Sequence, residues 1–158
     1  MKGDPKVIEV LNQLLADELT AINQYMVHSE MCANWGYDRL HHVIEKRAID
    51  EMHHAEGLIA RIIFFEGMPI VSKLNPITIG KMVPEMIRND NDAEVSAIAA
   101  YNAGIRVAVG AGDEASADLL RKVLHDEERH LDWGEAQLDQ IQQMGLENYL
   151  SEQTEEED

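Results

Sequence analysis

Two segments of the chain carry a glutamate and a histidine three positions apart within long apolar patterns. AIDEMHHAEG at 48–57 contains Glu51 and His54, and LHDEERHLDW at 124–133 contains Glu127 and His130. Residues three apart lie on one face of a helix, so each pair can reach a common ion. Because a buried ionisable group without a partner is costly, the two pairs together indicate a metal site.

Two further glutamates stand in the same register. Glu18 and Glu94 also interrupt apolar stripes, and each precedes its partner, Glu51 or Glu127, by 33 positions. The second half repeats the first after 76 positions, so that ELTAINQY parallels EVSAIAAY and DEMHH parallels DEERH. In antiparallel helix pairs this spacing brings the four carboxylates to nearly the same height.

The predicted ligand set has four carboxylates, two imidazoles and no thiolate. Two divalent ions would neutralise the four negative charges, and this donor set suits iron or manganese better than structural zinc. A single residue of this kind is more often a paired core acid or a satisfied core histidine. Six in a two-fold register favour a dinuclear site, whose ligands are Glu18, Glu51, His54, Glu94, Glu127 and His130.

The elements that must position these residues are helices. Apolar periodicity and end signals such as Asp4 before Pro5 predict an all-α single domain over residues 1–158. The expected helices span about 5–34, 38–66, 83–111 and 113–144, with a short fifth helix at 146–153.

The connection between the second and third helices decides the topology. Residues 67–82 contain two prolines and two glycines and have no helical stripe. Fully extended, they could reach about 50 Å, which is the length of a long bundle helix. We therefore expect a crossover along the bundle, giving an up-down-down-up four-helix arrangement, with an Ω-loop packed at one end as the alternative.

Composition narrows the class of partner. The net charge of −17 disfavours nucleic acid and anionic membranes and makes cations the natural ligands. Composition alone fits better with an acidic surface that merely keeps a helical protein soluble. The apolar runs are too short for a bilayer span and the opening lacks a secretory signal, so a soluble cytoplasmic protein is expected. A lone cysteine, Cys32, is read as a buried apolar residue, and the acidic tail at 151–158 as frayed or solvated.

Met52 lies one position beyond Glu51 and so cannot share its helix face. It belongs to a second apolar stripe, which would be exposed to solvent in a single bundle. We expect a partner subunit to cover this stripe. The spacing alone favours packing over ligation for Met52. The stripe consists of Ile49, Met52, Ile59 and Ile63 with Leu19 and Met26.

The chain resembles the bacterioferritins, the haem-containing ferritins, from MKGDPKVI through LADELTAINQY, NWG, IDEMHHAE and DEERHLDW to MGLENYL. The resemblance implies a homo-oligomeric shell of 24 subunits built from two-fold dimers. Each subunit would hold two iron ions and oxidise Fe(II) to Fe(III) with O2 or H2O2. A b-type haem would be shared between two subunits, and a small ferredoxin would supply electrons for iron release.

The resemblance also implies individual roles. Glu51 and Glu127 would bridge the irons and Glu18 and Glu94 would be terminal ligands, completed by His54 and His130. Met52 and its two-fold copy would ligate haem iron, which reverses the expectation from spacing, and Tyr25 would be a redox-active tyrosine. The sequence departs from the family on the inner surface, where Lys46 stands in place of a common histidine and Glu45 in place of a tyrosine.

Three other classes of protein share parts of this pattern. A rubrerythrin-like peroxidase normally carries a cysteine-rich iron domain that one cysteine cannot supply. DNA-protecting mini-ferritins place their ligands between subunits, whereas the register here lies within one chain. A haem-bridged structural shell or electron carrier with an inert dinuclear site stays open.

Overall fold

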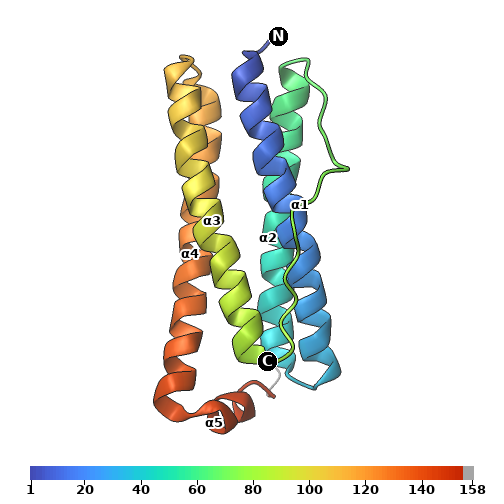
Figure 1. Ribbon diagram of the computed structural model, residues 1–158, viewed down its shortest axis with the longest axis vertical. Coiled ribbons are helices and arrows are strands. Elements are labelled where there is room, and N and C mark those ends of the chain that lie inside the picture. Colours follow the sequence, from blue (N-terminus) through green and yellow to red (C-terminus); the bar gives the residue numbers. More distant parts are fainter. Residues whose placement is uncertain (155–158) are drawn as a thin grey trace.

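The computed structural model describes residues 1–154, and these residues form a bundle of four long helices with a short fifth helix across one end (Figure 1). This is the expected ferritin-like architecture. The helices are α1 (Pro5–Asn34), α2 (Asp38–Phe64), α3 (Val83–Gly110), α4 (Glu114–Met144) and α5 (Leu146–Ser151).

Most helix ends follow the sequence signals. The Asp4 side chain accepts a hydrogen bond of 2.8 Å from the Lys6 backbone N–H, which caps α1. Gly36 turns the chain between α1 and α2 with a φ of 78°. Helix α2 ends at Phe64, two residues earlier than expected, where Glu66 adopts a φ of 60°.

The crossover between α2 and α3 runs beside α1 for most of the bundle's length (Figure 1). Polar side chains of α1 accept its backbone N–H groups, which fixes its course. This arrangement confirms the expected crossover and rules out a loop packed at one end. The bonds run from Ile70 to Asn12 (2.8 Å), Asn75 to Thr20 (2.9 Å), Thr78 to Gln24 (3.1 Å) and Gly80 to His28 (2.9 Å).

The hydrophobic core is divided into two clusters. One combines residues such as Leu11, Leu58 and Leu120, and the other combines residues such as Ile44 and Met86 with Tyr149 of α5. The six predicted ligands stand between the two clusters in sequence on all four long helices. The polar centre therefore interrupts an otherwise apolar interior.

The C-terminal tail differs in part from expectation. Gln153 is only 5% exposed, and its carbonyl accepts a hydrogen bond of 3.1 Å from the Arg39 backbone N–H. The expectation of a solvated tail is therefore wrong at Gln153, and its part at 155–158 lies outside the described residues. Within residues 1–154, none of the helices combines the length and apolar character needed to cross a membrane.

Candidate metal centre

The structure brings the six predicted ligands together at the middle of the bundle. They form two groups of four, each with ligand atoms that all lie within 4.8 Å of one another. Glu51 and Glu127 belong to both groups, so they stand between two neighbouring positions for an ion. The groups are Glu18, Glu51, His54 and Glu127, and Glu51, Glu94, Glu127 and His130, all of them buried.

The two histidines point the same ring atom into the centre. His54 Nδ1 lies 3.0 Å from a Glu51 oxygen, and His130 Nδ1 lies 3.0 Å from the other Glu51 oxygen. Their outer Nε2 atoms face carboxylates, at 2.9 Å for Asp126 and 3.3 Å for Asp50. A carboxylate at Nε2 keeps the proton there and leaves Nδ1 free to bind a cation.

The two terminal glutamates are each anchored by a buried tyrosine. The Tyr25 hydroxyl donates to Glu94 Oε1 at 2.5 Å, and the Tyr101 hydroxyl donates to Glu18 Oε1. Tyr25 therefore lies beside the predicted centre. Tyr101 was missed from the sequence, although the 76-residue repeat that relates it to Tyr25 was the signal for it.

Arg47 is a second residue that the sequence analysis missed. It is buried, and its Nη2 donates a hydrogen bond of 2.7 Å to Glu94 Oε1. Its guanidinium lies over the rings of Tyr25, at 4.8 Å, and Trp133, at 5.3 Å. The position of Arg47 four residues before Glu51, hence near it on one helix face, was the only available signal.

Without ions, protons stabilise the cluster. Burial raises the pKa of Glu18 well above its usual value, and the negative charge of Glu51 adds to the effect. Burial opposes protonation of His130, but its contacts with Glu51 and Glu94 outweigh this and raise its pKa to about 10. Cations that bind here must therefore displace protons.

Several buried atoms of the cluster make no well-aligned hydrogen bond. They are Glu51 Oε1, Glu94 Oε2, Glu127 Oε1 and His130 Nδ1. Three of them nevertheless lie close to another ligand atom, since His130 Nδ1 is 3.0 Å from Glu51 Oε1 and Glu127 Oε1 is 3.1 Å from His54 Nδ1. A buried polar atom without a good hydrogen bond is costly, and ligand atoms that converge on one point suit a cation once their protons are displaced. Oxygen and imidazole donors in two adjoining groups therefore fit a pair of divalent ions of the iron or manganese type.

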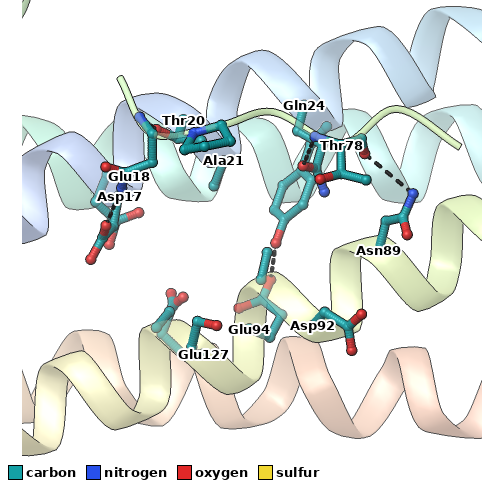
Figure 2. Close-up of a pocket in the computed structure, with 16 residues that line it drawn as sticks. Asp17, Glu18, Thr20, Ala21, Gln24, Thr78, Asn89, Asp92, Glu94 and Glu127 are labelled. Atoms are coloured by element: carbon teal, nitrogen blue, oxygen red, sulfur yellow. Dashed lines mark hydrogen bonds between the residues drawn. The ribbon is translucent and has the colours of Figure 1, made fainter. Parts of the chain in front are cut away.

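A pocket of about 300 Å³ leads from the surface to the cluster, between α1 with its crossover and α3 (Figure 2). Glu18, Glu94 and Glu127 line its inner part. Asp17 and the exposed Asp92 line it further out, where the Asn75 side chain donates to Asp17 at 2.5 Å.

Met52 lies on the outer surface of α2 and is 42% exposed. Met26, Ile49 and Ile63 of the predicted second stripe are exposed as well. Leu19 and Ile59 are partly buried against the core instead. The structure thus leaves most of this apolar stripe uncovered in the single chain.

Comparisons with known proteins agree with this architecture. A sequence model of the ferritin-like domain family matches residues 8–144. The bacterioferritin of Brucella melitensis is 44% identical over 149 residues, covering 94% of this chain and 92% of that protein. A bacterial ferritin of Synechocystis is 44% identical over 154 residues, covering 97% and 99%. The bacterioferritin of Streptomyces coelicolor is 41% identical over 151 residues, covering 96% and 90%.

Proposed function

The chain belongs to the bacterioferritins of the ferritin-like family, and from this premise we propose that it stores iron by oxidising Fe(II) at a dinuclear site within each subunit. Glu51 and Glu127, which belong to both groups of ligand atoms, would hold both ions. Glu18 with His54 and Glu94 with His130 complete the two positions.

The cluster of buried ligand atoms carries this proposal. Four buried ligand atoms in the centre make no well-aligned hydrogen bond, and carboxylate and imidazole groups from four helices converge there. Such an arrangement is costly when empty and becomes favourable when two cations fill it. Two Fe(II) ions bound there supply the two electrons that, with two protons, convert O2 to H2O2 or H2O2 to two waters.

The chain's own residues bind, orient and exchange protons. Asp126 and Asp50 hold His54 and His130 with Nδ1 facing the ions. Tyr25 fixes one oxygen of Glu94 and leaves the other free for ligation. The protons displaced from the cluster when ions bind are then available for the reduction of the oxidant.

The pocket beneath the crossover supplies the route for the substrate. Asp17 and Asp92 line its outer part, and the ligands Glu18, Glu94 and Glu127 line its inner part, so carboxyl groups follow the path from the surface to the centre. Acidic walls raise the local concentration of a divalent cation. Fe(II) is therefore expected to enter each subunit directly through this pocket.

The exposed stripe on α2 is the proposed contact between two subunits of a 24-subunit shell. Met52 presents a thioether there among exposed apolar side chains, which suits ligation of a b-type haem shared by two copies. The haem would accept electrons from a small ferredoxin and support iron release from the stored mineral.

One experiment tests the proposal as a whole. The purified protein is analysed for mass and haem absorption, and Fe(II) oxidation is then followed with O2 and with H2O2. Glu18→Ala and His130→Ala should abolish fast oxidation while the assembly keeps its mass, and Glu9→Ala, on the exposed side of α1, should not. Unchanged oxidation in both ligand variants would show that Fe(II) is not oxidised at this site. An absent haem band would show that Met52 does not bind haem.

A further inference from the structure

The internal repeat relates the two halves of the centre almost residue by residue. The ligands, the tyrosines that donate to them and the outer carboxylates all recur after 76 positions, whereas one buried residue with a hydrogen bond to a ligand does not. The matching pairs are Glu18 and Glu94, Tyr25 and Tyr101, Asp50 and Asp126, Glu51 and Glu127, and His54 and His130. The exception is Arg47, which the repeat pairs with Val123, and both side chains are 4% exposed.

The contacts of Arg47 and Val123 differ in kind. Arg47 donates to Glu94 Oε1, which also accepts from the Tyr25 hydroxyl. Val123 packs in an apolar cluster. One oxygen of Glu94 is thus shared by two donors, one of them a full positive charge, and only its Oε2 is left without a partner.

The negative charge of Asp90 does not cancel the effect of the positive charge of Arg47 on Glu94. Asp90 is buried beyond Tyr25, where it accepts hydrogen bonds from Gln24 and His28. Its negative charge offsets part of the field of Arg47. Arg47 nevertheless contacts Glu94 directly at 2.7 Å, so its influence on that ligand is the stronger one.

We propose that Arg47 makes the two metal positions unequal, so that the position of Glu18 and His54 binds its ion more tightly and fills first. The proposal deepens the proposed function and rests on it. A fixed cation repels a second cation nearby, and a guanidinium bonded to Glu94 reduces the charge that this carboxylate can donate. Arg47 acts through Glu94 and is a positioning residue.

The expected difference in affinity is about tenfold or more, because the repulsion between the buried guanidinium and a nearby cation needs to exceed only the ~1.4 kcal/mol of a tenfold change after Asp90 has offset part of it. Weaker binding is expressed mainly as faster release. The position of Glu94 and His130 should therefore exchange its ion more readily with the surroundings.

The test is a titration of the metal-free assembled protein with Co(II), followed by visible absorption and calorimetry. Wild-type protein should bind two ions per subunit in two steps. His54→Ala should remove the tight step, and His130→Ala should remove the weak one. Arg47→Gln, which keeps a donor for Glu94 but loses the charge, should tighten the weak step by about tenfold. Arg47→Lys keeps the charge and should retain the wild-type separation.

The outcomes separate this inference from the function on which it rests. Two ions bound with equal affinity, or a tight step lost in His130→Ala, would overturn the inference and leave the proposed function standing. Failure to bind Co(II) at all would overturn both. If Arg47→Gln does not assemble, the two histidine variants and Arg47→Lys still decide the order of filling.

Discussion

Replacing Glu18 by glutamine should separate the stability of the metal-free protein from its ability to bind ions. Burial, the charge of Glu51 and a hydrogen bond to Glu51 raise the pKa of Glu18 well above normal, so the metal-free protein holds this side chain as a neutral acid. A glutamine has the same shape and can make the same contacts. Its amide oxygen accepts from Tyr101, and its amide nitrogen donates to Glu51.

The magnitude follows from these contacts. With both hydrogen bonds kept, the free energy of unfolding without metal should change by less than about 1 kcal/mol. With metal, the variant loses one anionic ligand and should lose one bound ion. An ion at a hundredfold excess over its dissociation constant contributes about 2.7 kcal/mol. At about 2 to 4 °C per kcal/mol, the metal-dependent rise in melting temperature should be smaller by about 5 to 10 °C.

The assay is thermal unfolding by circular dichroism, with a chelator and with Zn(II), which is not oxidised and isolates binding from chemistry. Glu9→Gln, a change of an exposed glutamate on the same helix, is the matched control and should behave as wild type in both conditions. A Glu18→Gln protein that still shows the full Zn(II)-dependent rise would refute the reasoning. A large loss of stability without metal would refute the view that Glu18 is neutral there.

Three further results are expected. Because the pKa of His130 is raised to about 10, the folded chain binds more protons than the unfolded chain between pH 6.5 and 10. The contribution of His130 to metal-free stability should therefore be complete below pH 6.5 and lost as the pH rises to about 10. The melting temperature of the metal-free protein should fall over this range. Gly134→Ala should destabilise by about 1 to 3 kcal/mol, because its Cβ would overlap the side-chain oxygen of Asn91 on α3. Gly57→Ala, with its nearest contact at 3.5 Å, should stabilise by up to about 1 kcal/mol, and denaturant unfolding compares the two. Asp126→Asn should weaken Zn(II) binding about 10- to 100-fold by calorimetry, because the orientation of His54 depends on it; an unchanged affinity would contradict that role.

The periodicity of the sequence predicted the helices and the meeting of six polar residues because both depend on regular helical geometry. Glu18 and Glu51 face each other once their helices pair, whatever the details of packing. The length and composition of the crossover predicted its path. The hydrogen bonds between the crossover backbone and α1 side chains such as His28 could not be predicted. They depend on the exact course of a backbone that has no regular secondary structure.

Isolated buried polar residues were the main omission. Arg47 belongs to no repeat, and a single arginine on a helix is usually solvated, so only its neighbours in space reveal its partner Glu94. Tyr101 could have been found, because the repeat pairs it with Tyr25. Gln153 lies in a strongly acidic tail whose average composition conceals one residue that the fold buries.

The division of the interior into two apolar clusters affects where the helices open locally. The two clusters lie in opposite halves of the bundle, and on each long helix the buried polar layer stands between them. Emptying that layer should loosen the middle of the four long helices while both ends stay closed. In the metal-free protein, amide hydrogen exchange within α2 and α4 should then be fastest around Glu51 and Glu127. In ordinary helices the middle is the part that opens most slowly.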